Sequence, residues 1–387
     1  MNTPRTAPRV DAIAPFHVMD ILARAHALAA AGRDVIHLEI GEPDFPTPAA
    51  IVEAGVTALR AGHTRYTGAL GLPALRAAIA AFYATHWDAE VDAARVVVTP
   101  GASGALLLAL GLLAGPGDEV LMADPGYPCN RHFTRFCEAH AVTVPVDANS
   151  DFQLTLEHVI RHATPATRAV LVASPSNPTG TLMPAAELAR IRDWCRDQGV
   201  ALIVDEIYLG LTYEGDAHSA ARWDDVFVIN SFSKQFLMTG WRLGWLVAPA
   251  WAVPQIERLA QNLFLAAPTP AQHAALAAFE PTTLVELDAR RDELRARRDF
   301  LLPALRELGF VVPATPHGAF YLYADCSAFG DDSFTFARRL LEDAAVAITP
   351  GIDFGTHCAD RYVRFAYTQP QPHLAEAIAR IARFVQT

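Results

Sequence analysis

The sequence has almost no lysine. Lysine and arginine together number 31 among the 387 residues, and 30 of these are arginines, so that Lys234 is the one lysine. A GC-rich genome that favours arginine codons explains the arginines, but it does not explain why one lysine remains. A guanidinium stays protonated, whereas a lysine amine can lose its proton and form an imine. A chemical role is therefore one interpretation of Lys234, and chance retention is the other.

Long apolar runs and paired cysteines are also missing. The longest strongly apolar stretch, residues 105–114, is too short to cross a bilayer. Residues 1–16 lack the continuous apolar core of a signal peptide. The five cysteines form no C-x-x-C pair, which is typical of reduced thiols in the cytosol. We therefore expect a soluble cytoplasmic protein.

Positive charge is scarce, and several well-known site motifs do not occur. The net charge of −11 argues against a basic nucleic-acid-binding face and against attraction to an anionic membrane. The chain contains no G-K-[ST], G-x-G-x-x-G or H-E-x-x-H motif. His158 and His162 have the spacing of a helical metal pair, but without an acidic third ligand a solvated face is the favoured interpretation. We expect no metal, nucleic-acid or membrane partner.

The chain instead contains short β-branched runs that alternate with amphipathic helical patterns. Strands are expected at residues 96–98, 119–122, 142–146, 169–173, 201–204, 226–230 and 241–247, and helices between them at 102–114, 130–140, 184–198 and 251–264. This alternation is typical of an α/β fold with a mainly parallel, seven-stranded sheet flanked by helices.

The last third of the chain has a different pattern. A long charged helix is expected at residues 283–308, followed by strands at 319–324 and 362–367 and helices at 333–343 and 373–385. This order predicts a smaller α+β domain. Residues 1–45 are too few to form a core alone, and we expect them to pack against it. The expected division is a large domain at 46–280 and a small domain made of 1–45 and 281–387.

Polar loops follow immediately after four of the expected strands. They are G-A-S at 101–103, S-N-P at 176–178, D-E-I-Y at 205–208 and S-F-S-K at 231–234. Because ligands bind beyond the carboxyl ends of strands in open parallel sheets, these loops are expected to meet at one edge. The single lysine therefore shares that edge with an acid, an amide, a tyrosine and a glycine turn.

This combination of groups matches what pyridoxal 5′-phosphate (PLP) requires. Lys234 offers an amine for the aldehyde, and Asp205 offers a carboxylate that keeps the pyridine nitrogen protonated. Tyr208 and Asn177 offer hydrogen-bond donors for the phenolate oxygen. Taken alone, Asp205 is also typical of a helix N-cap, and Tyr208 is also typical of a core aromatic residue.

A phosphate site is expected next to the lysine. Ala102 and Ser103 begin an expected helix, whose backbone N–H groups and dipole can bind an anion. Ser231 and Ser233 flank the lysine with hydroxyl groups. Arg242 follows closely, and its planar guanidinium suits phosphate. In isolation these features also fit a simple β–α turn and a surface arginine.

Taken together, the motifs resemble those of a known family. The matching stretches are L-E-I-G-E-P-D-F (38–45), Y-T-G-A-L-G (66–71), T-P-G-A-S-G-A-L (99–106), D-P-G-Y-P (124–128), P-S-N-P-T-G (175–180), D-E-I-Y (205–208), S-F-S-K-x7-W-R-L-G-W (231–245), G-A-F-Y-L (318–322) and R-Y-V-R-F-A-Y (361–367). In this order, and over nearly the full length, the chain resembles the PLP-dependent class I/II aminotransferases of fold type I, the aspartate aminotransferase superfamily.

The resemblance implies a role for each cofactor residue. Lys234 would hold the cofactor as a Schiff base and later move a proton. Asp205 would pair with the pyridine nitrogen, and Tyr208 and Asn177 would bond the phenolate oxygen. Tyr127 would stack on the ring. The residues implied at the phosphate are Ala102, Ser103, Ser231 and Arg242. Ser233, which flanks the lysine, is also expected to bind the cofactor.

The resemblance also implies substrate residues and a second subunit. Arg364 would bind the substrate α-carboxylate, and Gly41 and Asn177 would line the substrate site. Without the resemblance, Arg364 is equally typical of a surface arginine on a strand. Tyr66 would reach the phosphate of the neighbouring subunit, which implies a homodimer with shared active sites.

The implied activity is ping-pong transfer of an amino group from an L-amino acid to a 2-oxo acid. No second lysine exists, and no arginine or histidine stands out as a partner for a second substrate carboxylate, so a neutral, aromatic or broad substrate range is expected. A carbon–sulfur β-lyase of the same fold is an open alternative. A non-enzymatic PLP-binding regulator is disfavoured, because the residues before the first motif contain no basic helix-turn-helix pattern.

Overall fold

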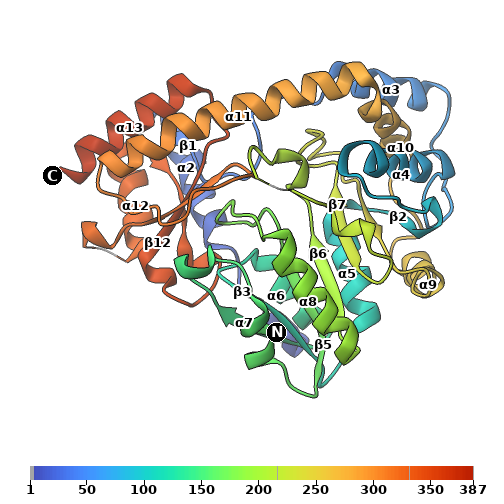
Figure 1. Ribbon diagram of the computed structural model, residues 1–387. Helices are drawn as coiled ribbons and strands as arrows, with labels where there is room; N and C mark the ends of the chain where they lie inside the picture. The colour runs from blue at the N-terminus through green and yellow to red at the C-terminus, as the bar shows by residue number, and fades with distance from the viewer. Residues whose placement is uncertain (1–3, 216, 331, 387) are drawn as a thin grey trace.

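The computed structural model describes residues 4–215, 217–330 and 332–386 and contains a central seven-stranded sheet (Figure 1). Its strands are β2 (Val96–Thr99), β3 (Glu119–Asp124), β4 (His140–Pro145), β5 (Thr167–Ala173), β6 (Ala201–Asp205), β7 (Phe227–Ser231) and β8 (Gly244–Val247), in the order β2-β8-β7-β6-β5-β3-β4. Strand β8 runs antiparallel to both of its neighbours, β2 and β7, and the other strand pairs in this sheet are parallel. The predicted mainly parallel sheet is confirmed.

Both faces of the sheet are buried. Successive side chains of a strand point to opposite faces, so Val170 of β5 packs in one core and Leu171 in another. The first core includes residues of α8 (Ala185–Gln198), and the second includes residues of α5 (Gly101–Leu113). Figure 1 shows α8 in front of the sheet and α5 behind it. Because both faces are buried, the sequences of these strands are nearly continuous apolar runs.

Two boundaries differ from those expected from the sequence. The helix expected at 130–140 is α6 (Pro128–Phe136), which ends early because His140 already pairs with Glu119 as the start of β4. The strand expected at 241–247 begins only at Gly244, because Arg242 has a φ of 53° within a turn. The remaining helices around the sheet are α3 (Ala49–Arg60), α4 (Pro73–Trp87), α7 (Leu156–His162), α9 (Val253–Leu263) and α10 (Thr269–Ala275).

A separate core joins the two ends of the chain. It contains Ile21 and Leu38 from the N-terminal segment together with Phe336 and Leu374 from the last third. The elements around this core are α2 (His17–Ala30), β1 (Ile36–His37), β9 (Tyr321–Asp325), α12 (Ser333–Ala344), β10 (Val346–Ala347), β11 (Thr349–Pro350), β12 (Tyr362–Ala366) and α13 (Gln371–Val385). Strand β1 pairs with β10 in parallel, and β9 and β11 pair with β12 in an antiparallel sheet. The short helix α1 (Pro8–Asp11) has no buried residue, and its Arg9 pairs with Glu138.

The long helix α11 (Pro281–Glu307) connects the two regions. Figure 1 shows it running across the top of the molecule, from the neighbourhood of α13 to that of α10. Leu287 packs in the core beside the main sheet, whereas Leu301 packs in the core of the chain ends. Neither this helix nor any other in the described part of the chain is long and apolar enough to cross a membrane.

Candidate active site

A cavity of about 410 Å³ lies where the carboxyl ends of the strands meet the core that joins the two ends of the chain. Its volume falls within the range of small-molecule sites. The sequence-predicted residues that line it are Gly41, Ala102, Ser103, Tyr127, Asn177, Asp205, Tyr208, Ser231, Ser233, Lys234, Arg242 and Arg364. The fold therefore brings together residues that are more than three hundred positions apart in the chain.

Tyr66 is the one predicted site residue that lies elsewhere. Its side chain is 82% exposed and borders a separate groove between α3 and α10. The family resemblance implies that Tyr66 reaches the site of a neighbouring subunit. Its exposure in a single chain agrees with that prediction but does not test it.

Lys234 lies three residues after the end of β7 and lines the cavity. Its Nζ donates a hydrogen bond to the carbonyl oxygen of Gly41 at 2.6 Å. Burial lowers the pKa of the Lys234 amine to about 8; the nearby Glu42 carboxylate opposes this shift, and the charge of Arg364 adds to it. An appreciable share of the amine is thus unprotonated near neutral pH, which is the form that attacks a carbonyl carbon.

Asp205 is the last residue of β6 and is 5% exposed. One carboxylate oxygen accepts the N–H of Ile207 at 3.1 Å, and burial raises the pKa of the carboxyl group to about 6. Its neighbour Glu206 turns away from the cavity and bonds Ser219 and the backbone of Ala220. Asp205 therefore keeps hydrogen-bonding capacity for a protonated ring nitrogen.

The start of α5 forms the anion-binding side of the cavity. A Cβ on Gly101, which has a φ of +71°, would lie 2.7 Å from Nη2 of Arg242, so this guanidinium rests against the first turn of the helix. A Cβ on Gly244 would lie 2.8 Å from the backbone nitrogen of Ala102. Only glycine permits this close approach of β8 to the helix. Backbone donors and a guanidinium at a helix start are suited to phosphate.

The guanidinium of Arg242 has no acidic partner within the described residues. It donates to the carbonyl oxygen of Thr239 at 2.9 Å. The hydroxyl groups of Ser231 and Ser233 lie 3.0 Å apart beside it. This part of the cavity therefore combines an unneutralised positive charge with hydroxyl donors, and the residues fit a phosphate group.

Arg364 lies on β12 with its guanidinium between two aromatic rings. Its central carbon is 4.2 Å from the ring centre of Tyr321 and 4.9 Å from that of Phe354. Nη1 donates to Oδ1 of Asn177 at 3.0 Å, and Nη2 donates to the carbonyl oxygen of Glu39 at 2.6 Å. Its buried Nε has no partner, and no carboxylate among the described residues pairs with it. A buried cation with an unused donor fits a substrate carboxylate.

Tyr208 has a partner that the sequence did not assign. Its hydroxyl lies 2.8 Å from the hydroxyl of Tyr321, and the two rings meet edge to face. Tyr321 belongs to the G-A-F-Y-L motif, so the motif marked its neighbourhood but gave it no role. Phe354 was also missed, because no motif marks the loop that carries it.

The N-terminal helix α2 forms an unexpected wall of the cavity. The side chains that line it here are Phe16, Val18, Met19 and Leu22. The start of this helix is held by Asp353, whose carboxylate accepts the N–H groups of His17 and Val18 at 2.7 and 2.8 Å. The apolar pattern of α2 does not reveal which face meets a cavity, so the sequence carried no signal for this wall.

The part of the chain that the structure describes contains no group of three or more His, Cys, Asp or Glu residues that could hold a metal ion. His158 instead takes part in a capping box with Thr155 at the start of α7. The nitrogen Nδ1 of His162 lies 2.9 Å from the carbonyl oxygen of His158. The helical histidine pair is therefore engaged in local hydrogen bonds.

Known proteins share this architecture over almost its whole length. The family model for aminotransferase class I and II matches residues 33–381. The chain is 39% identical over 386 residues to the valine–pyruvate aminotransferase of Mycobacterium tuberculosis, with 99% of each chain covered. It is 36% identical over 367 residues to the arginine–pyruvate transaminase of Pseudomonas aeruginosa, with 94% of this chain and 93% of that protein covered.

A solved structure agrees with these sequence matches. The aspartate aminotransferase from Thermus thermophilus with maleate superposes with a TM-score of 0.93 at 33% identity, covering 98% of this chain and 100% of that chain. The fold is therefore that of the aspartate aminotransferase superfamily, whose class I members use PLP. The chain belongs to the class I and II aminotransferases and is an enzyme of the transferase type that acts on amino acids and oxo acids.

Proposed function

We propose that this enzyme binds PLP in the cavity and moves an amino group from a neutral or aromatic L-amino acid to a 2-oxo acid in two half-reactions. One observation carries the proposal. Three cationic groups, those of Lys234, Arg242 and Arg364, face one cavity, and neither arginine has an ion-pair partner among the described residues. A phosphate, an aldehyde and a carboxylate satisfy all three.

The cofactor, when bound, supplies an electron sink for the charge that develops at the substrate Cα. Asp205 would keep the pyridine nitrogen protonated. Tyr208 and the amide nitrogen of Asn177 would donate to the phenolate oxygen, and Tyr127 would cover the ring. All four of these residues line the cavity of the single chain.

The phosphate would be anchored at the start of α5. Ala102 and Ser103 line the cavity there and would offer backbone N–H groups, and the hydroxyl groups of Ser231 and Ser233 and the guanidinium of Arg242 line the same cavity. Tyr66 of a second copy would complete this anchor, which is why we propose a homodimer.

No disulfide joins the described cysteines, which supports a cytoplasmic location.

Lys234 would do two tasks in sequence. Its amine would first hold the cofactor and would be released when the amine of the substrate takes its place. As a free amine, Lys234 would take the proton from the substrate Cα and deliver it to the former aldehyde carbon of the cofactor. Arg364 orients the substrate during this transfer by binding its α-carboxylate.

The wall of the cavity supports a neutral side chain on the substrate. Helix α2 contributes three apolar side chains to it and its N-cap residue Phe16 a fourth, and Glu42 and Asp353 add acidic groups. Among the described lining residues the only cations are Lys234, Arg242 and Arg364, and each already has a proposed partner. A second substrate carboxylate would therefore meet no free positive charge in this chain.

Arg364→Gln is expected to lower kcat/KM for amino donors by about 100-fold or more, mainly through KM. The reason is that glutamine cannot form a charged bidentate pair with the α-carboxylate. Steady-state kinetics measure the effect, and cofactor binding should stay unchanged. Arg361→Gln is the matched control, because this nearby arginine is 52% exposed and pairs with Asp325 instead. Equal KM values for wild type and Arg364→Gln would contradict the role.

The decisive experiment for the proposed function is a half-reaction screen. The purified PLP form is mixed with one amino acid at a time, and the absorbance of the bound cofactor is followed as it converts to pyridoxamine phosphate. Neutral and aromatic donors should convert it, and an oxo acid should reverse the change. Failure of every donor would reject transamination. Release of pyruvate and a thiol from an S-substituted cysteine, with no oxo acid present, would indicate the β-lyase alternative.

A further inference from the structure

Tyr321 connects two parts of the cavity that the proposed function treats separately. It is the first residue of β9 and is 1% exposed. Its hydroxyl contacts the hydroxyl of Tyr208 at 2.8 Å, and its ring lies 4.2 Å from the guanidinium carbon of Arg364. A Cβ on Gly41 would lie 2.3 Å from the same hydroxyl. The tyrosine thus fills the space between the cofactor side and the substrate side.

The direction of the hydrogen bond between the two tyrosines follows from proton counting. A phenol has one proton to donate. If Tyr208 gives its proton to the phenolate oxygen of the cofactor, its own oxygen can only accept from Tyr321. A hydroxyl that accepts a hydrogen bond becomes a stronger donor, because the bonds in such a chain polarise one another.

We propose that Tyr321 is a positioning residue with two separable functions: its hydroxyl strengthens the hydrogen bond from Tyr208 to the cofactor, and its ring holds the guanidinium of Arg364 flat for the substrate carboxylate. This inference rests on the proposed roles of Tyr208 and Arg364. The hydroxyl acts on the electronic state of the cofactor, whereas the ring acts on substrate binding through a cation–π contact.

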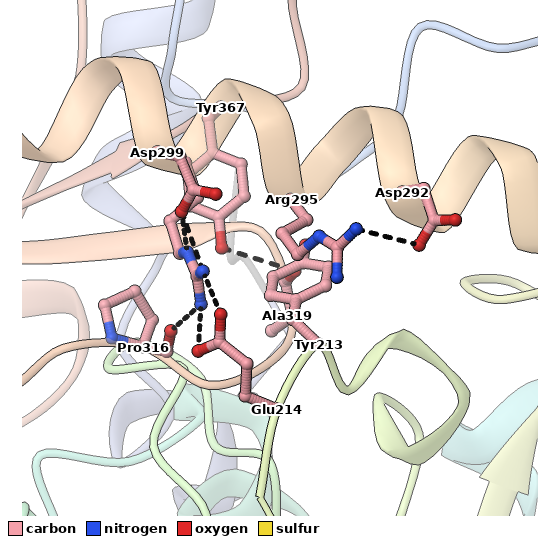
Figure 2. Close-up of polar contacts among 9 residues, drawn as sticks. Tyr213, Glu214, Asp292, Arg295, Asp299, Pro316, Ala319 and Tyr367 are labelled. Carbon is pink, nitrogen blue, oxygen red and sulfur yellow. Dashed lines mark hydrogen bonds and ion pairs between the residues drawn. The ribbon is translucent and has the colours of Figure 1, made fainter.

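The turn before β9 holds this tyrosine in place. Figure 2 shows Glu214, Asp299 and the carbonyl group of Pro316 converging on one guanidinium, which belongs to Arg298 of α11. The hydroxyl groups of Tyr213 and Tyr367 both donate to the carbonyl oxygen of Ala319 (Figure 2).

The backbone of the same turn is also constrained. Ala319 has a φ of 59°, in the left-handed region that a residue with a Cβ rarely occupies. The strand expected from residue 319 therefore begins only at Tyr321. Because the turn is bonded from both α11 and the segment after β6, removing only the Tyr321 hydroxyl should leave the position of the ring unchanged.

Tyr323 provides a matched control on the same strand. It lies two residues further along β9, so it points to the same face, and it is 3% exposed. Its hydroxyl is buried and has no hydrogen-bond partner. Tyr323 stands opposite Arg364 in the pairing of β9 with β12, but its hydroxyl bonds neither Arg364 nor Tyr208. Tyr323→Phe therefore removes the same atom from the same strand without breaking a hydrogen bond to either residue.

The first test is a pH titration of the bound cofactor in the holoenzyme. A donor on the phenolate oxygen draws away charge that would otherwise stabilise the protonated lysine–cofactor linkage, so it lowers the pKa of that linkage. Tyr321→Phe weakens this donor and should raise the apparent pKa, read from absorbance, by about half a unit to one unit. Tyr323→Phe should leave it at the wild-type value. The KM for the amino donor should change by less than about twofold in Tyr321→Phe.

The second test separates the ring from the hydroxyl. Tyr321→Leu removes both, so it should repeat the pKa shift and also raise the KM for the amino donor by about tenfold, because Arg364 loses one aromatic face. An unchanged pKa in Tyr321→Phe, or an equal shift in Tyr323→Phe, would overturn the inference. A wild-type protein that acquires no lysine-linked absorbance would instead overturn the proposed function, so the two failures are distinguishable.

Discussion

Lys234→Arg is expected to lower transamination by about 10⁴-fold or more and to abolish covalent attachment of the cofactor. Arginine keeps the positive charge at this place but offers no amine that can form an imine or carry the Cα proton. No other lysine exists in the chain to take over. The loss of activity would therefore measure the missing amine and not a change in positive charge.

Borohydride reduction followed by peptide mass mapping measures this effect directly. Wild type should carry one reduced cofactor on the peptide that contains Lys234, and Lys234→Arg should carry none. Lys234→Ala serves as the companion variant, because a small primary amine added to the solution should restore part of its proton transfer. Covalent labelling that persists in Lys234→Arg would show that the assignment of Lys234 is wrong.

Asp205→Asn is expected to reduce kcat by about 10²–10³-fold. Asparagine has the same shape as aspartate but cannot hold a proton on the pyridine nitrogen, so the cofactor withdraws electrons less strongly. Asp205 is buried, and burial raises the pKa of its carboxyl group to about 6. Its position is therefore suited to a cationic partner. Binding of that partner would return the carboxyl group to its ionised form.

The adjacent acid provides the control for this prediction. Glu206→Gln changes a carboxylate that is equally buried but bonds Ser219 and the backbone of Ala220 instead of facing the cavity. Burial raises the pKa of Glu206 to about 8, and glutamine replaces its carboxyl group with a neutral group of the same shape. Steady-state kcat in Glu206→Gln should stay near wild type. Equal losses in both variants would show that the effect of Asp205→Asn is structural.

Local sequence was most informative along the main sheet. The strands are short and largely apolar, four of them are followed by polar loops, and the parallel arrangement of those four places their loops at one edge. Lys234, Asp205 and Arg242 could therefore be assigned to one site before any coordinates. Errors arose at boundaries such as Arg242 and Ala319, where a positive φ ends a strand that the residue pattern alone would extend.

The core that joins the two ends of the chain was much less predictable from the sequence. Helix α2 and the turn before β9 meet the cavity only because residues near both ends of the chain pack together. Asp353 fixes the start of α2 through two backbone N–H groups. A contact between a carboxylate and backbone groups more than three hundred residues away leaves no local pattern in either segment.

The sequence by itself thus determined the family, the fold class and the residues expected to hold the cofactor, because those depend on motifs whose spacing follows strand and loop geometry. Only the tertiary structure decided that the start of α2 lines the cavity, and that Tyr321 contacts both Tyr208 and Arg364. These features depend on how distant segments pack around one cavity. Packing of that kind is set by the shapes of both cores together, and no single stretch of the chain encodes it.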